Sequence, residues 1–180
     1  MKILLTAINS KFIHSNLAVR YLKAFTEDMD YISKIREFSI NDRDEKVLEE
    51  IIKEKPDIVA FSTYIWNIEM VKRLSNLIKI VNSDIKILYG GPEVSYDSSN
   101  ILNELNGDYL IEGEGEKTYR EFVEYTLGER DIKSIRGLYY KEGNKVIGNG
   151  NRPLMNMNEI VFPYKMDENL DNKIVYYEAS

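Results

Sequence analysis

Cysteine is absent from the 180-residue sequence, and histidine occurs once, as His14. A chain without cysteine forms no disulfide, no zinc–thiolate site and no iron–sulfur ligand set of its own, and it has no cysteine nucleophile. A single histidine cannot build a histidine-rich metal site. These two absences exclude most of the metal centres that protein side chains hold by themselves.

Dense positive charge and long apolar runs are also missing. The chain has 24 basic and 30 acidic side chains and a net charge of -6, without a Lys/Arg block. Binding to a phosphate backbone depends on clustered positive charge. No apolar run approaches membrane-spanning length, and the apolar stretch within residues 1–8 is too short for the core of a signal peptide. We therefore expect a cytoplasmic protein with no nucleic-acid partner and no membrane span.

Apolar periodicity predicts an α/β fold organised around residues 56–93. A buried strand at 57–62 is followed by helical spacing of apolar side chains over 65–81 and by a second buried strand at 85–89. Along the chain, five helices alternate with five strands, which are expected at residues 3–8, within 31–38, and at 57–62, 85–89 and 109–112. The crossover rule makes such a sheet parallel. We predict a flavodoxin-like (Rossmann-like) five-stranded parallel sheet with helices on both faces.

The pattern changes in the carboxyl-terminal part of the chain. Residues 135–141 and 145–147 predict a β-hairpin appended to the main sheet. We therefore divide the chain into an α/β domain at 1–130, the hairpin at 131–150, and a segment at 151–180 that consists of an extended linker and a last strand at 173–180. That strand has no partner in the sequence, which suggests a missing neighbour.

The carboxyl ends of two neighbouring strands carry groups suited to a ligand. In open parallel sheets, ligands bind just beyond these ends. Here the ends are Ser62-Thr63-Tyr64 and Gly90-Gly91. The hydroxyls can donate and accept hydrogen bonds, and the glycines leave backbone bare, so a flat group can slide between the strands.

Several common ligands of this architecture lack the residues they need. The loop at 9–14 contains no glycine for a dinucleotide, and the run Gly113-Glu114-Gly115 lacks the third glycine of that fingerprint and carries carboxylates that would repel phosphate. No phosphate-binding Gly-Lys-Ser/Thr motif occurs, and Ser10 alone hardly supplies the phosphate loop of a flavodoxin. A phosphorylated receiver domain needs acidic residues where Asn9 and Ser62 stand.

Two elements of the chain resemble the cobalamin-binding domain family. Ser62-Thr63-Tyr64 is similar to that family's Ser-x-Leu, with tyrosine in place of leucine, and Gly90-Gly91 is similar to its Gly-Gly pair. The Asp-x-His-x-x-Gly loop is missing. The chain most resembles the amino-terminal domain of cobalamin-dependent radical S-adenosylmethionine enzymes, whose members often lack that histidine and carry segments similar to 89–93 and 112–116. They include enzymes named anaerobic magnesium-protoporphyrin monomethyl ester cyclases.

The resemblance implies that cobalamin is the cofactor, with its nucleotide tail in the crevice between the strand ends. It implies no catalytic residue in this chain, and His14 stands away from the family histidine, so we do not expect it to ligate cobalt. Tyr64 and Trp66 could cover an apolar face of the ligand or belong to the core. The cofactor-binding residues implied are Asn9, Ser10, Lys11, His14, Ser62, Thr63, Tyr64, Gly90, Gly91, Pro92, Glu93, Glu112, Gly113 and Gly115.

The resemblance also implies a partner domain. In the family, the last strand is followed by the cysteines that hold a 4Fe-4S cluster, and this cluster and S-adenosylmethionine belong to a carboxyl-terminal catalytic domain of the same polypeptide. The present chain would then bind cobalamin without catalysing a reaction. The alternative is a stand-alone flavodoxin-like binding or signalling module that does not bind cobalamin, in which Gly90-Gly91 is only a turn before Pro92.

Overall fold

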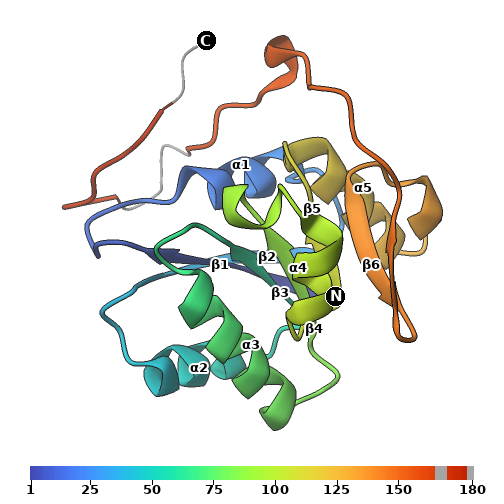
Figure 1. Ribbon diagram of the computed structural model, residues 1–180. Helices are drawn as coiled ribbons and strands as arrows, with labels where there is room; N and C mark the ends of the chain where they lie inside the picture. The colour runs from blue at the N-terminus through green and yellow to red at the C-terminus, as the bar shows by residue number, and fades with distance from the viewer. Residues whose placement is uncertain (165–169, 178–180) are drawn as a thin grey trace.

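A seven-stranded sheet forms the centre of the protein, for which a computed structural model describes residues 1–164 and 170–177 (Figure 1). The strands follow the order β2-β1-β3-β4-β5-β6-β7. The first five run parallel, and β6 and β7 run antiparallel. Their bounds are Lys2–Asn9 (β1), Ile32–Ser39 (β2), Ile58–Ser62 (β3), Lys86–Gly90 (β4), Tyr109–Ile111 (β5), Leu138–Glu142 (β6) and Lys145–Gly148 (β7).

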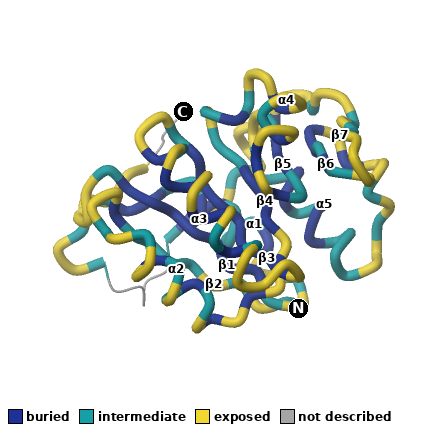
Figure 2. Tube along the Cα trace, turned by 60° about the horizontal axis from the view of Figure 1, so that its bottom comes forward, coloured by how far each residue is buried: buried dark blue, intermediate teal, exposed yellow. Residues whose placement is uncertain are grey.

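Helices cover both faces of the sheet and bury two separate cores. One core packs against α1 and α5, and the other packs against α2, α3 and α4. Strand β1 serves both, because successive side chains point to opposite faces: Leu5 joins the first core and Leu4 the second. The central strands are buried accordingly (Figure 2). The helices span Leu17–Phe25 (α1), Asp44–Lys53 (α2), Ile68–Val81 (α3), Ser98–Glu104 (α4) and Glu116–Thr126 (α5), with short 3-10 turns at Pro92–Val94 (η1), Ile132–Ser134 (η2) and Met157–Glu159 (η3).

The predicted α/β fold, its five parallel strands and the hairpin appended to them are confirmed; because the hairpin joins the same sheet, that sheet has seven strands rather than five. Strand β6 pairs antiparallel with β5, with Leu110 opposite Tyr139, and β7 pairs with β6. Leu138 and Tyr140 are buried on the α1/α5 side, while Tyr139 packs toward the other core. The hairpin therefore covers the edge that β5 would otherwise expose.

Two differences from the sequence expectation concern the start of α3 and the last predicted strand. Helix α3 begins at Ile68 rather than at Ile65, because the side chain of Asn67 stabilises a turn: its Oδ1 accepts a hydrogen bond from the backbone N–H of Tyr64 at 2.8 Å. At 173–177 the expected strand is reduced to one bridge between Ile174 and His14. Residues 178–180 of that prediction lie outside the described residues.

A carboxylate near the end of α2 gathers three cations. Glu54 is 8% exposed and lies 2.9 Å from Lys2 Nζ, 2.6 Å from Lys34 Nζ and 2.5 Å from Arg36 Nη2. The hydrogen bonds from Lys34 and Lys2 lower the pKa of Glu54 from an ordinary value of 4.5 to about 2. This cluster ties α2 to β1 and β2.

None of the helices in the described part of the chain has the length and apolar character that crossing a bilayer requires.

Candidate cofactor site

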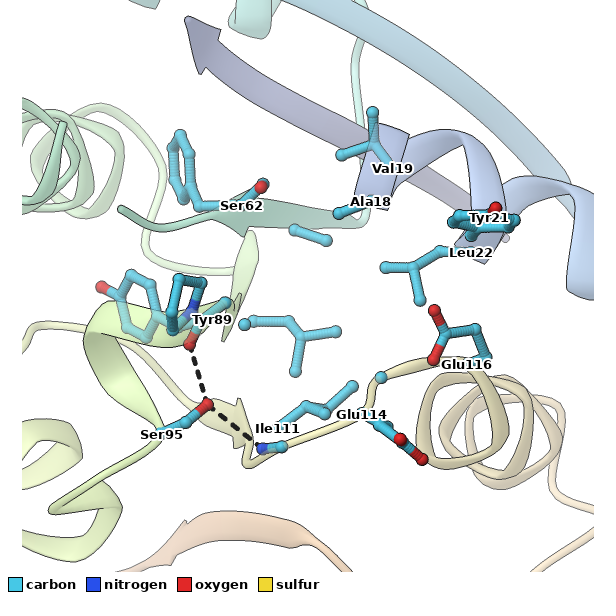
Figure 3. A pocket seen from close by; sticks show the side chains of 18 of the residues that line it. Ala18, Val19, Tyr21, Leu22, Ser62, Tyr89, Ser95, Ile111, Glu114 and Glu116 are labelled. Atoms are coloured by element: carbon cyan, nitrogen blue, oxygen red, sulfur yellow. Dashed lines mark hydrogen bonds between the residues drawn. The ribbon is translucent and has the colours of Figure 1, made fainter. Parts of the chain in front are cut away.

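A cavity of about 550 Å³ opens at the carboxyl ends of the parallel strands, between the sheet and α1 (Figure 3). Its floor is one face of the sheet, formed by Leu5, Ala60, Leu88 and Ile111 from four neighbouring strands. Its roof comes from α1 and includes Leu17, Ala18 and Leu22. We call this space the sheet-edge cavity. The chain continues from β1 to β2 on one side of the sheet and from β3 to β5 on the other. The cavity lies at this reversal of strand order, where open α/β sheets bind ligands.

Glycine-rich turns form two sides of the sheet-edge cavity. Gly90 ends β4 and is followed by Gly91 and Pro92, and residues 113–116 lead from β5 into α5. Ser95 joins the two turns, because its Oγ donates to Gly91 O at 2.8 Å and accepts from Gly113 N at 3.1 Å (Figure 3). The side of the cavity formed by these turns is therefore braced within the protein.

Glycine occurs at positions 90 and 91 for two different steric reasons. At Gly91 the backbone has φ +112°, and an added Cβ would lie 2.4 Å from Thr63 O, so the fold itself requires glycine there. At Gly90 an added Cβ would meet no atom within 4 Å. Since Gly90 lines the cavity, its missing side chain leaves space that the protein does not fill.

Ser62 carries a buried hydroxyl that the described residues leave without a hydrogen-bond partner. The residue is 7% exposed, lies at the end of β3 and lines the sheet-edge cavity. Burying an unsatisfied hydroxyl costs about 1–3 kcal/mol. Beside the apolar side chains of floor and roof, Ser62 Oγ is thus an unsatisfied polar atom in the wall of the cavity.

The hydroxyl and the backbone N–H of Thr63, in contrast, are hydrogen-bonded within the protein. Its Oγ1 and its backbone N both donate to Gly90 O, at 2.6 and 2.7 Å. It is completely buried and does not line the cavity. Thr63 therefore fixes the turn at Gly90 and Gly91.

Asn67 fixes the distance between the ends of β1 and β3. Its Nδ2 donates to Ile8 O at 2.9 Å and to Ser62 O at 3.0 Å, and the residue is completely buried. The sequence analysis missed this role. The available signal was an asparagine in the first turn of the expected helix, since this residue type favours caps and turns.

The loop after β1 is held by contacts away from the cavity. Asn9 Nδ2 donates to His14 O at 2.8 Å, and His14 Nδ1 contacts the hydroxyl of Tyr176, whose ring stacks on the imidazole at 5.6 Å. Ser15 donates from N and from Oγ to Ile174 O. This loop therefore packs against residues 174–176.

An aromatic pair lies at the turn after β3. The rings of Tyr64 and Trp66 stack at 4.5 Å and 6°. Trp66 remains 46% exposed, although its Nε1 donates to Ile8 O at 3.3 Å. Tyr64 lines the cavity, so the stacked pair lies at its edge rather than in either core.

One family model, described as the B12 binding domain, matches residues 3–123. The chain belongs to this family. The matched region contains the five parallel strands, apart from Lys2 at the start of β1, and all the residues that line the sheet-edge cavity except Leu154.

This B12-binding domain spans about a quarter or less of the length of the three relatives described next. An uncharacterised methyltransferase of Pyrococcus horikoshii is 33% identical over 115 residues, which are 63% of this chain and 25% of that protein. The cobalamin-dependent radical SAM methyltransferase TokK of Streptomyces tokunonensis is 27% identical over 95 residues, covering 52% of this chain and 14% of TokK. The structure of the cobalamin-dependent S-adenosylmethionine radical enzyme OxsB with aqua-cobalamin bound has a TM-score of 0.72 at 18% identity and covers 90% of this chain and 24% of OxsB. The likeness to OxsB concerns the fold.

The sheet-edge cavity brings together part of the site set expected for the B12-binding domain. Lining residues from that set are Ser62, Tyr64, Gly90, Gly91, Pro92, Gly113 and Gly115. Residues of the set that do not line it are Asn9, Ser10, Lys11, His14, Thr63, Glu93 and Glu112. The sequence analysis did not include the α1 roof, because the apolar stripe of a helix does not distinguish a core contact from a cavity wall. Among the described residues, no group of three or more histidine, aspartate or glutamate side chains is arranged to hold a metal ion.

Proposed function

We propose that this B12-binding domain holds cobalamin with the terminal base of the nucleotide tail inside the sheet-edge cavity. The observation that carries the proposal is the buried Ser62 Oγ, for which the described residues supply no hydrogen-bond partner, in a space lined mostly by apolar side chains. A tail base offers flat apolar faces and a ring nitrogen that can accept one hydrogen bond. These properties match the floor, the roof and the Ser62 hydroxyl.

Gly90 and Tyr64 have defined parts in this arrangement. Gly90 lets the tail pass close to the end of β4, since nothing replaces its side chain. The stacked pair of Tyr64 and Trp66 supplies an exposed apolar surface at the edge of the same cavity, suited to the rim of a corrin ring. When bound, cobalamin supplies a carrier for a methyl group or an electron, which the side chains of this chain do not provide.

We propose that His14 does not ligate cobalt. Its Nδ1 already contacts Tyr176, and the residue does not line the cavity. A His14→Ala variant is expected to give the same visible spectrum with bound cobalamin as the unchanged domain. Loss of a nitrogen-ligated spectrum in this variant would show that His14 is a ligand.

For the full-length protein we infer a carboxyl-terminal catalytic domain that holds a 4Fe-4S cluster and S-adenosylmethionine and carries out methyl transfer or cyclase-type chemistry. The similarity to TokK, a cobalamin-dependent radical SAM methyltransferase, and to OxsB, a cobalamin-dependent S-adenosylmethionine radical enzyme, supports this inference. The test is the gene sequence after Ser180. A Cys-x-x-x-Cys-x-x-Cys motif there supports a fused radical enzyme, and a stop codon supports a stand-alone module.

Cofactor binding is tested by titration with hydroxocobalamin, followed by gel filtration and visible spectra. We expect a red species to elute with the protein. Cobinamide, which lacks the nucleotide tail, is the matched probe and should bind more weakly. Failure of a folded protein to retain cobalamin would refute the proposal and favour the alternative module.

A further inference from the structure

One lining residue of the sheet-edge cavity lies outside the family match. Leu154 follows the hairpin, 31 residues beyond the last matched position, yet it lines the cavity beside residues 113–116. Its side chain is 85% exposed, whereas the next residue, Met155, is buried. A large apolar side chain that is exposed at a cavity edge gains from contact with an apolar ligand.

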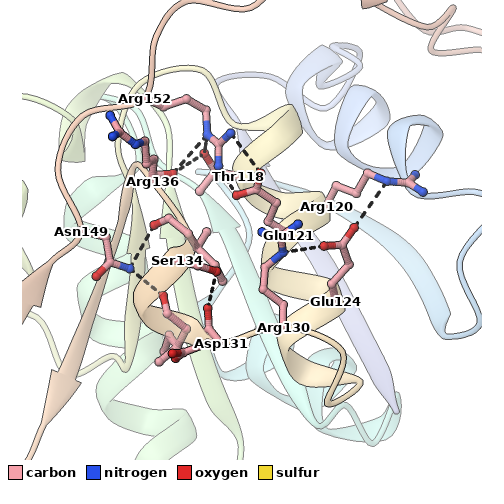
Figure 4. A network of polar contacts seen from close by, with 12 residues as sticks. Thr118, Arg120, Glu121, Glu124, Arg130, Asp131, Ser134, Arg136, Asn149 and Arg152 are labelled. Carbon is pink, nitrogen blue, oxygen red and sulfur yellow. Dashed lines mark hydrogen bonds and ion pairs between the residues drawn. The ribbon is translucent and has the colours of Figure 1, made fainter.

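An arginine anchors the chain just before Leu154. Arg152 Nε donates to Thr118 Oγ1 at 2.8 Å and to Arg136 O at 3.1 Å, and its Nη1 donates to Glu121 Oε1 at 3.2 Å (Figure 4). Its second Nη pairs with the other carboxylate oxygen of Glu121. A two-pronged pair of this kind fixes direction as well as distance. The chain at residue 152 is therefore tied to α5.

A second anchor lies just after Leu154. The backbone N–H of Met155 donates to Glu114 Oε2 at 2.6 Å, and Glu114 itself lines the cavity. Leu154 is thus held between an attachment to α5 and an attachment to the turn that precedes α5.

We propose that residues 152–155 form a strap that completes the cofactor site, with Leu154 covering the base of the cobalamin tail. This inference rests on the proposed function. It assigns a binding role to a segment beyond the B12-binding match. It also explains why an exposed leucine is held by anchors on both sides.

The test compares Leu154→Ser with Met157→Ser in the 180-residue chain. Met157 is a matched control because it is an exposed apolar residue three positions further along the chain, in η3, and does not line the cavity. We expect Leu154→Ser to raise the Kd for cobalamin about fivefold to tenfold, since an apolar contact is lost. The Kd for cobinamide should not change, because cobinamide lacks the tail base. Met157→Ser should leave both constants unchanged.

The outcomes separate the strap from the proposed function. If the unchanged protein retains cobalamin and Leu154→Ser binds it equally well, the strap is wrong while the cofactor site stands. An equal loss of cobalamin and cobinamide affinity would also overturn contact with the tail. If the folded, unchanged protein retains no cobalamin, the proposed function fails and the strap fails with it. A second variant, Glu121→Gln, loosens the Arg152 anchor and should weaken cobalamin binding while leaving cobinamide binding unchanged.

Discussion

Replacing Gly90 by leucine separates folding from cofactor binding. A Cβ at Gly90 meets no atom within 4 Å and Gly90 lines the sheet-edge cavity, so we expect the larger side chain to enter that cavity. Unfolding free energy should therefore change by no more than about 0.5 kcal/mol. In the cofactor complex the same side chain competes with the tail. Overfilling a packed site costs about 1–3 kcal/mol, which corresponds to a loss of affinity of about fivefold to 150-fold.

The assay for Gly90→Leu combines urea denaturation with titration by hydroxocobalamin. A matched comparison is Gly91→Ala, because its Cβ would clash with Thr63 O and the backbone has a left-handed φ. Gly91→Ala should lower the unfolding free energy by about 1–3 kcal/mol before any ligand is added. Unchanged cobalamin affinity in a folded Gly90→Leu variant would refute the placement of the tail in this cavity.

Three further changes test separate parts of the structure. Ser62→Ala should weaken cobalamin binding about twofold to tenfold, without weakening cobinamide binding, because one hydrogen bond to the tail is lost; equal effects on both ligands would contradict this contact. Asn67→Ala should lower the unfolding free energy, measured in urea, by about 1–3 kcal/mol, because Ser62 O loses its buried donor; unchanged stability would show that the bridge is dispensable. Glu54→Gln should lower it by about 1–2 kcal/mol at pH 7, less than the pKa shift alone implies, because two of the three cations are partly exposed to solvent. The folded-state pKa of about 2 lies below 4.5, so the stabilisation by Glu54 is present above about pH 4.5 and is lost as the pH falls toward 2; a difference between the two proteins that persists at pH 2 would argue against these ion pairs.

The fold could be predicted from the sequence because its signals are local. Apolar runs and helical spacing located the five parallel strands and the helices between them. The place of the hairpin in the sheet could not be found in this way. Pairing of Leu110 with Tyr139 joins residues that are far apart in the sequence, and no periodic pattern specifies which edge a hairpin will cover.

Part of the site was also accessible from sequence. The rule that ligands bind beyond strand ends pointed to Ser62 and Gly90, which line the cavity. It could not distinguish Gly91, which Thr63 requires, from Gly90, which leaves open space. Leu154 had no signal at all, since a leucine in an irregular segment resembles any other exposed apolar residue.

The bridge that Asn67 makes between Ile8 O and Ser62 O has a kinetic consequence. Because one amide holds both strand ends, the edge of the sheet beside the sheet-edge cavity keeps its shape before any molecule enters. Little reorganisation is then required on association, and the observed rate should rise in proportion to corrinoid concentration, without a plateau that would report a slow opening step.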